Sequence, residues 1–176
     1  VFMAIFSKGP FGLLIPLLVS ISHLIFEKKL RTIKFYWGWK TWLILIFLCS
    51  VWFFGVYFES GPEYLNNLLF NQTVNRGINT FHHKEPFYYY MVSFWYSLAP
   101  WSLLIFGVLL HSVVKRQIKT DLERFFLTTI LVIFVMLSLV SSKIQIYLAP
   151  AFPFIIYLPA LLFQEFKWNR WLAITV

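Results

Sequence analysis

The positions of lysine and arginine constrain the fold of this chain more than any other feature. Eleven of the fifteen basic residues fall within three short clusters, at residues 28–40, 115–124 and 167–170, and long apolar runs separate the clusters. Short loops rich in lysine and arginine stay on the cytoplasmic side of a membrane. The pattern therefore predicts a protein that crosses the membrane several times and returns each basic cluster to the same side.

Composition supports a membrane protein independently. The chain is 60% hydrophobic and only 12% charged, which leaves too few polar side chains to cover a soluble globule. The formal net charge of +8 does not indicate a nucleic-acid-binding protein, because apolar runs interrupt the basic residues. The single cysteine, Cys49, excludes an intramolecular disulfide and a cysteine-based metal cluster.

The apolar runs predict an all-α, polytopic transmembrane helical bundle, because about 20 residues of helix span a bilayer. We expect one transmembrane domain over residues 1–176, with an external loop at residues 59–87. The expected spans are residues 10–26, 41–58, 88–111, 125–142, 144–163 and the truncated start of a sixth at 171–176. Prolines within the spans predict kinked helices. The chain begins inside an apolar segment and has no initiator methionine, so we expect a piece of a longer protein.

Four basic residues lie outside the clusters, singly and at the opposite ends of the apolar runs: Lys8, Arg76, Lys84 and Lys143. Retention of basic loops in the cytoplasm does not explain cations on the external side. These four residues are therefore the first candidates for a functional role.

The external loop begins with a turn signal and a short helical pattern. Gly61-Pro62-Glu63 places proline at the first position of a helix, with an acid in its first turn. Apolar residues then recur with helical spacing at positions 64, 65, 68 and 69. This pattern predicts a short helix that lies on the membrane surface.

Five motifs occur in order along the chain and, in the predicted topology, on the same side of the membrane. They are Ser7-Lys8-Gly9-Pro10, residues 61–65 leading to Arg76, residues 83–90, Ala99-Pro100-Trp101, and residues 141–153. Together they resemble the polyprenyl-phosphate-sugar-dependent glycosyltransferases of GT-C architecture. The chain is similar especially to the bacterial lipid A aminoarabinose transferases, and also to the protein O-mannosyltransferases, over essentially its whole length.

This resemblance implies a multi-span enzyme of the bacterial inner membrane whose active site faces the periplasm. The donor would be a sugar linked to undecaprenyl phosphate or a similar lipid, and the acceptor would be lipid A or another envelope glycan. It also implies that the general base is an acidic residue upstream of residue 1, so we expect the chain to lack its catalytic carboxylate. Many members of the group carry a histidine shortly before the loop arginine, where this chain has Gln72-Thr73-Val74-Asn75.

Sugar transfer from a lipid phosphate leaves a phosphate anion, which fixed cations stabilise best where water is scarce. Arginine can bind phosphate through two hydrogen bonds, whereas lysine acts as a point charge. We therefore predict that Lys8, Arg76 and Lys143 bind the donor phosphate. Candidates for other substrate contacts are Lys84 and the aromatic side chains that would line a groove for the isoprenoid tail, Tyr88, Tyr89, Tyr90 and Tyr147.

Simpler roles stay open for the candidate cations and tyrosines. Lys8 and Lys143 could extend along the lipid to reach water, and Lys84 could be solvated. Arg76 could pair with Glu63 or cap the surface helix. The tyrosines could belong to an aromatic belt at the membrane interface.

A divalent metal is a further possibility, held by His82 and His83 with Glu85. Adjacent histidines point in different directions, however, which favours ordinary loop residues over metal ligands. We therefore predict no metal site from the sequence alone.

Two other classes of protein compete with the transferase. A transporter or channel subunit would also contain intramembrane charges and broken helices, but its charges should lie near the bilayer midplane. The four single cations lie instead at one surface of the predicted bundle. A membrane scaffold without catalytic activity leaves these one-sided cations unexplained.

Overall fold

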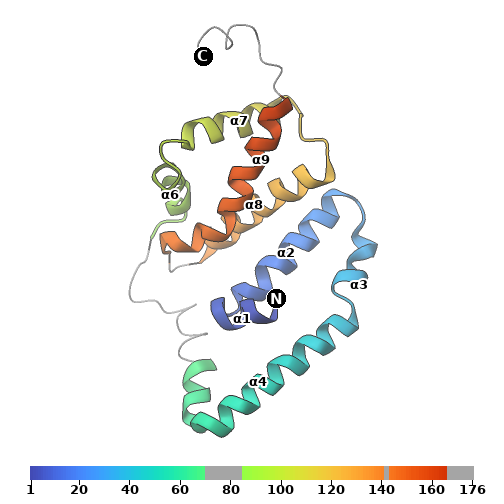
Figure 1. The fold of residues 1–176 in the computed structure, drawn as a ribbon, viewed down its shortest axis with the longest axis vertical. Helices are drawn as coiled ribbons and strands as arrows, with labels where there is room; N and C mark the ends of the chain where they lie inside the picture. Colours follow the sequence, from blue (N-terminus) through green and yellow to red (C-terminus); the bar gives the residue numbers. More distant parts are fainter. Residues whose placement is uncertain (70–84, 141–142, 166–176) are drawn as a thin grey trace.

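A computed structural model describes residues 1–69, 85–140 and 143–165. Every regular element within these ranges is helical, which confirms the all-α prediction (Figure 1). The α-helices are α1 (Phe2–Lys8), α2 (Phe11–Phe26), α3 (Ile33–Tyr36), α4 (Trp39–Asn66), α6 (Tyr89–Ser97), α7 (Ser102–Val114), α8 (Asp121–Leu139) and α9 (Phe152–Glu165). Two 3₁₀ helices, η1 (Leu30–Thr32) and η3 (Gln145–Ala151), connect some of them.

Three helical stretches of the described residues are long and apolar enough to cross a membrane: Leu30–Leu69, Asp121–Leu139 and Gln145–Phe163. The pair α6 and α7 adds a fourth if it counts as one broken span. The expected span at residues 10–26 corresponds to α2, which is apolar but has only 16 residues. The structure confirms a multi-pass helical architecture with three or four candidate spans, and residues 171–176 lie outside the described residues.

The expected span at residues 88–111 is divided into two helices. α6 ends at Ser97, α7 begins at Ser102, and the two helices are bent by 118° relative to each other. Pro100 has no N–H to donate and disfavours helical backbone at the residue before it. The sequence predicted only a kink at this proline, and that prediction was wrong because the helix stops and starts again in a new direction.

The predicted turn at Gly61 is confirmed. Gly61 has φ 77° and ψ 173° within α4, a backbone conformation that glycine adopts without steric cost. The helix resumes at Pro62, where the missing N–H of proline leaves no hydrogen bond unmade. The last turns of α4 therefore leave the axis of the helix at a sharp bend (Figure 1).

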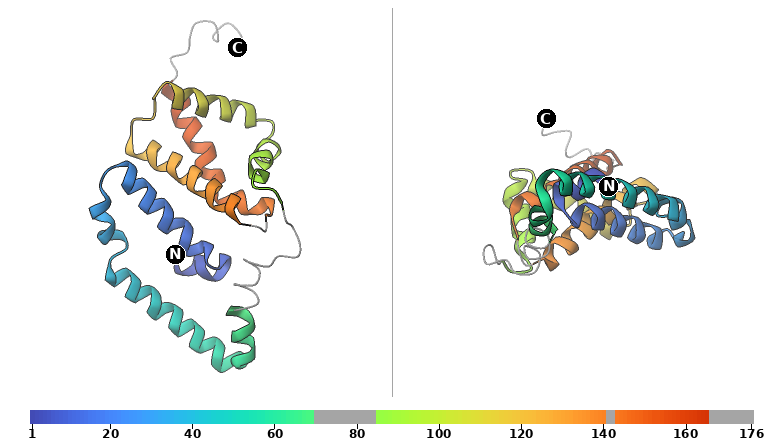
Figure 2. Two further views of the ribbon diagram at one scale, coloured as in Figure 1. Left: turned by 180° about the vertical axis from the view of Figure 1, so that it is seen from behind. Right: turned by 90° about the horizontal axis from the view of Figure 1, so that it is seen from below.

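The hydrophobic core lies among α6, α7, α8, η3 and α9. Its most deeply buried side chains are Tyr90, Ile133, Leu148, Ile155, Leu158 and Leu162. α2 packs against α8, and α1 packs against α2. α4 lies at the margin of the molecule (Figure 2), contributes no buried residue, and contacts α1 through the rings of Phe6 and Trp52 at 4.2 Å.

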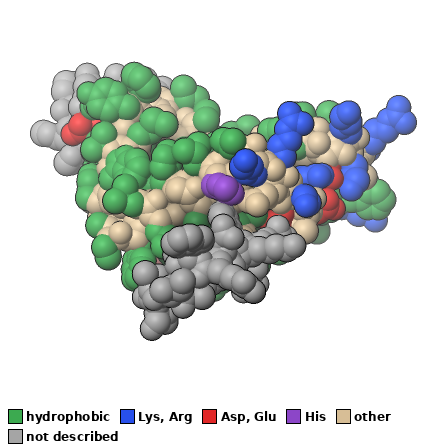
Figure 3. Space-filling model, turned by 90° about the horizontal axis from the view of Figure 1, so that it is seen from above, with side chains coloured by type: hydrophobic (Ala, Val, Ile, Leu, Met, Phe, Trp, Pro, Cys, Tyr) green, Lys and Arg blue, Asp and Glu red, His purple; other side chains and the backbone are tan. Residues whose placement is uncertain are grey.

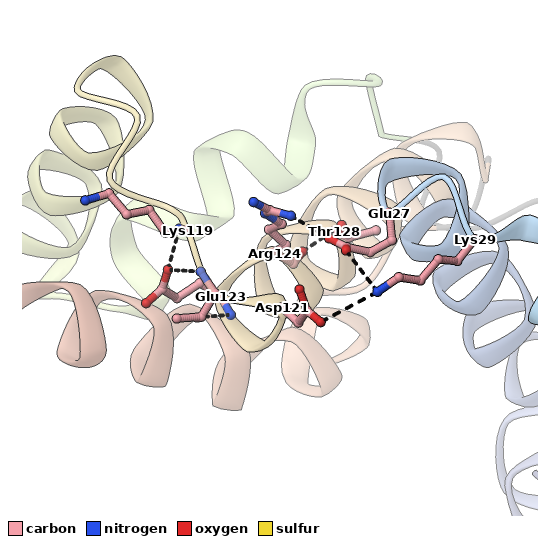
Figure 4. A network of polar contacts seen from close by, with 8 residues as sticks. Glu27, Lys29, Lys119, Asp121, Glu123, Arg124 and Thr128 are labelled. Carbon is pink, nitrogen blue, oxygen red and sulfur yellow. Dashed lines mark hydrogen bonds and ion pairs between the residues drawn. The ribbon is translucent and has the colours of Figure 1, made fainter.

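Ion pairs join α2 and α8 at one end of the bundle. Arg124 Nη1 donates a 2.9 Å hydrogen bond to Glu27 Oε1, and Lys29 lies 3.6 Å from Glu27 and 4.0 Å from Asp121 (Figure 4). The hydrogen bond from Arg124 holds the pKa of Glu27 below its usual range. Two of the three basic clusters therefore meet at this end of α2 and α8, which we call the basic end.

Lysine and arginine side chains gather toward one side of the surface in Figure 3, and hydrophobic side chains are frequent on the other side of that view. α2 and α8 run antiparallel (Figure 1), so the N-terminal end of α2 and the C-terminal end of α8 lie away from the basic end. We call this the opposite end. Lys8 ends α1 and lies three residues before the first residue of α2, and Lys143 follows α8, so both belong to the opposite end.

A matched pair of glycine substitutions tests the packing of α1 on α2. A Cβ at Gly12 would collide with the backbone of Ala4 and Ile5, so Gly12→Ala should lower the free energy of unfolding by about 1–3 kcal/mol. A Cβ at Gly55 would meet nothing within 4 Å, so Gly55→Ala should be neutral or stabilise by up to about 1 kcal/mol. Chemical unfolding of the full-length protein in detergent measures both effects, and equal stabilities would contradict this packing.

Candidate functional site

Lys143 is the best defined of the predicted site residues. Its side chain is buried, with an exposed fraction of 5%. The ammonium Nζ donates hydrogen bonds of 2.7 Å to the carbonyl of Val140 and 3.1 Å to the carbonyl of Glu85. A lysine ammonium has three N–H donors. Two of them therefore bind backbone oxygens, and their positions fix the direction of the third.

The charge of Lys143 has no acidic partner within the part of the chain that the structure describes. Burial of a cation costs free energy unless hydrogen bonds or an opposite charge compensate for the lost water. The two carbonyls compensate in part and leave the positive charge intact. This arrangement differs from a lysine that extends along lipid to water, and it suits a side chain that attracts an anion.

Side-chain hydrogen bonds fasten the residues after Lys143 to α6. The hydroxyl of Tyr90 donates to the carbonyl of Ile144 at 3.3 Å, and Gln145 Nε2 donates to Ser97 Oγ at 2.8 Å. Tyr90 itself is fully buried in the core. The ammonium of Lys143 thus lies between the carbonyl of Val140, at the C-terminal end of α8, and the carbonyl of Glu85, the first described residue after the loop.

The structure places Lys8 at the same end of the bundle but does not bring it into contact with Lys143. Lys8 is exposed in the last turn of α1, and no hydrogen bond or ion pair between described residues joins it to Lys143. Arg76 and Lys84 lie outside the described residues. Convergence of Lys8, Arg76 and Lys143 on one phosphate therefore stays a prediction.

The tyrosines predicted to line one groove have different environments. Tyr88 is 50% exposed and contacts Phe87 with ring centroids 5.5 Å apart. Tyr89 and Tyr147 are partly buried and pack against the core. Tyr90 is fully buried, and its hydroxyl donates to the carbonyl of Ile144. A shared groove for the four tyrosines stays a prediction.

The structure does not test the possible metal site at His82, His83 and Glu85. His82 and His83 lie outside the described residues, and Glu85 is exposed. Among the residues that the structure does describe, no three histidine, cysteine, aspartate or glutamate side chains are grouped closely enough to hold a metal ion.

The bend of α4 forms an apolar pocket of about 290 Å³ that the sequence analysis missed. Its lining residues are Ser50, Phe53, Phe54, Tyr57 and Leu65. Four of these side chains recur at helical spacing before Gly61, and the bend at Gly61 brings Leu65 back beside them. This spacing together with the turn signal was the available clue. The pocket belongs to the part of α4 that leads into the loop.

Comparison with known proteins finds several relatives at low identity. The chain is 28% identical over 153 residues to an uncharacterised protein of Aquifex aeolicus. The matched region covers 86% of this chain and 29% of that protein. It is 24% identical over 148 residues to an undecaprenyl phosphate-α-4-amino-4-deoxy-L-arabinose arabinosyl transferase of Shewanella sediminis, covering 84% and 26%. A transferase of the same name from Aeromonas hydrophila is 25% identical over 181 residues, covering 97% and 32%.

No family model and no solved structure matches the chain. The chain spans between about a quarter and a third of the length of the curated relatives it matches. Most of this chain is thus similar to one part of several proteins that are named as arabinosyl transferases.

Removal of a single hydroxyl tests the link between α6 and the segment after Lys143. Tyr90→Phe leaves the carbonyl of Ile144 without its donor and should cost about 1 kcal/mol of unfolding free energy. Tyr88→Phe is the matched control, because Tyr88 is half exposed and should change stability by less than about 0.5 kcal/mol. Equal effects of the two substitutions in chemical unfolding would mean that Tyr90 does not hold this segment.

Proposed function

We propose that this chain is part of a membrane glycosyltransferase that moves a sugar from a polyprenyl-phosphate donor to an envelope acceptor. The observation that carries the proposal is the buried ammonium of Lys143, which has two backbone acceptors and no acidic partner among the described residues. Similarity to transferases named for an undecaprenyl phosphate-linked sugar supports the same function.

Lys143 binds the phosphate of the donor in this proposal. The bond between the sugar and the phosphate breaks during transfer, so negative charge grows on the phosphate oxygen that leaves. A cation that is already fixed by the protein stabilises that charge without reorganising at the moment of reaction. The carbonyls of Val140 and Glu85 hold the ammonium in position, and the remaining N–H donates to the phosphate.

Arg76 and Lys8 complete the phosphate site. Arg76 contributes two parallel hydrogen bonds, which a lysine cannot supply. Lys8 lies at the same end of the bundle as Lys143 and adds a second point charge. Lys84 contacts the substrate from the same loop as Arg76.

The isoprenoid tail of the donor lies against apolar surface at the opposite end of the bundle. Tyr88 and Tyr89 lie three and four residues after Glu85, and Tyr147 lies four residues after Lys143. The apolar pocket in the bend of α4 offers a second surface for the tail.

The opposite end faces the periplasm of a bacterial inner membrane, since the basic end remains in the cytoplasm. The acceptor is lipid A or another envelope glycan. The general base that deprotonates the acceptor hydroxyl comes from a part of the protein upstream of this chain. Lys143 and its neighbours therefore supply charge stabilisation and leave proton transfer to another segment.

Release of undecaprenyl phosphate tests the proposal in membranes that contain the full-length protein. The donor is undecaprenyl phosphate-α-4-amino-4-deoxy-L-arabinose, and the acceptor is lipid A. Mass spectrometry measures the two products, which are undecaprenyl phosphate and lipid A that carries the sugar. Lys143→Ala and Arg76→Lys should each reduce the rate by about 30-fold or more, because each loses roughly 2–4 kcal/mol of transition-state stabilisation. Lys34→Ala removes an exposed cation from the basic cluster and should leave the rate unchanged.

Each result bears on a different part of the proposal. Absence of product with the wild-type protein would contradict transfer of this sugar to this acceptor. A normal rate with Lys143→Ala, in protein that inserts into the membrane normally, would remove Lys143 from the phosphate site. A normal rate with Arg76→Lys would show that the two-hydrogen-bond geometry of arginine is not needed.

A further inference from the structure

The basic end contains a groove whose lining changes from charged to apolar along its length. Its volume is about 240 Å³, and it is lined by Phe26 at the last residue of α2 and by Arg124, Leu127, Thr128 and Leu131 of α8. The α8 residues form one stripe at spacings of three and four, and Arg124 lies in the first turn of the helix. The groove therefore runs about 10 Å along α8 from a guanidinium to a leucine.

Arg124 retains hydrogen-bonding capacity at the mouth of the groove. Only Nη1 of its guanidinium binds Glu27, whereas a guanidinium has five N–H donors. The side chain is 44% exposed. Glu27, Asp121 and Glu123 are the acids near Arg124. The two basic clusters that meet at this end contain nine lysines and arginines, five at residues 28–40 and four at residues 115–124. Cations therefore outnumber acids at the end of the molecule that carries the mouth of the groove.

Glu123, the acid next to Arg124 in the sequence, is held in the first turn of α8 by backbone hydrogen bonds. Glu123 is buried and accepts hydrogen bonds from the N–H groups of Lys119 and Thr120 at 2.8 and 3.0 Å. The Thr120 hydroxyl in return accepts from the N–H of Glu123 at 3.2 Å (Figure 4). This reciprocal cap fixes the first turn of α8, and with it the backbone that carries Arg124.

Lys28 occupies a backbone position that normally favours glycine. Its φ is 55°, and the N–H groups of Lys28 and Lys29 bind the carbonyls of Ile25 and Leu24 at 3.0 and 2.9 Å. This pattern ends a helix with a left-handed residue, and a residue other than glycine pays about 1 kcal/mol or more for it. A cation therefore stands two residues beyond Phe26 at a position where glycine would make a more stable chain.

We propose that this groove binds one anionic phospholipid, with the headgroup phosphate at Arg124 and Lys28 and the start of an acyl chain along Leu127 and Leu131. The lining residues change from charged to apolar along α8, and a phospholipid changes in the same way from its charged headgroup to its acyl chain. Basic pockets between membrane helices bind anionic headgroups in this way. The lipid would bridge α2 and α8 at the same place as the Glu27–Arg124 ion pair. This inference does not depend on the proposed transferase activity.

Native mass spectrometry of the full-length protein tests the proposal. Protein in detergent is mixed with equal amounts of phosphatidylglycerol and phosphatidylcholine, and the ratio of the two lipids that remain bound is measured. The wild-type protein should retain phosphatidylglycerol at least about fivefold better. Lys28→Gly should reduce this preference by roughly fivefold, which corresponds to about 1 kcal/mol for one basic residue near an anionic headgroup.

Arg116→Gly is the matched control for Lys28→Gly. Arg116 also has a left-handed backbone, with φ 53°, directly after α7, and its N–H binds the carbonyl of Val113 at 3.1 Å. Arg116 follows α7, which supplies no lining residue of the groove, whereas Lys28 lies two residues beyond the lining residue Phe26. Loss of Arg116 should therefore change the lipid preference by less than about twofold. Each glycine variant removes the steric strain of a side chain on left-handed backbone. Thermal unfolding should therefore show neither variant to be less stable than the wild type.

Leu131→Trp fills the apolar part of the groove without changing any charge, and it should reduce retention of phosphatidylglycerol by a factor similar to that of Lys28→Gly. Equal retention of the two lipids by the wild-type protein would overturn the proposal. An unchanged preference in Lys28→Gly, or an equal loss in Lys28→Gly and Arg116→Gly, would overturn it as well, because the effect would then come from overall charge and not from this groove.

Discussion

Burial of the Lys143 ammonium is the interaction on which the opposite end of the molecule depends. A buried cation needs partners, and those of Lys143 come from the finish of α8 and from Glu85, which lies 58 residues earlier in the chain. The hydrogen bond from Tyr90 to Ile144 strengthens the same connection. The charge itself is satisfied only in part, and this incomplete compensation is what makes Lys143 a candidate for binding an anion.

The two ends of the bundle use charge differently. At the basic end, cations are exposed and are balanced in part by Glu27 and Asp121. At the opposite end, Lys143 is buried and has no acidic partner within the described residues. Exposed pairs contribute little to stability and leave a positive surface, whereas a fixed, desolvated charge acts strongly on one nearby group. The proposed lipid groove and the proposed phosphate site follow from this difference.

Periodicity and local turn chemistry predicted much of the fold. The basic clusters predicted which helix ends meet, and Glu27 and Arg124 confirm this for two of the clusters. The bend at Gly61 followed from glycine and proline alone. The break at Pro100 could not be predicted as reliably, because Pro16 and Pro159 lie within continuous helices. Burial of Lys143 depends on a carbonyl far away in the sequence, and no local pattern contains that information.

In the proposed phosphate site, the Lys143 ammonium binds a lipid phosphate. An electron cryomicroscopy structure of the full-length protein with undecaprenyl phosphate tests this claim most directly, through the distance between Lys143 Nζ and the nearest phosphate oxygen. We predict a distance of about 3 Å, with the hydrogen bonds to Val140 and Glu85 retained. A well-ordered phosphate bound elsewhere, with Lys143 still enclosed by backbone oxygens alone, would contradict the claim.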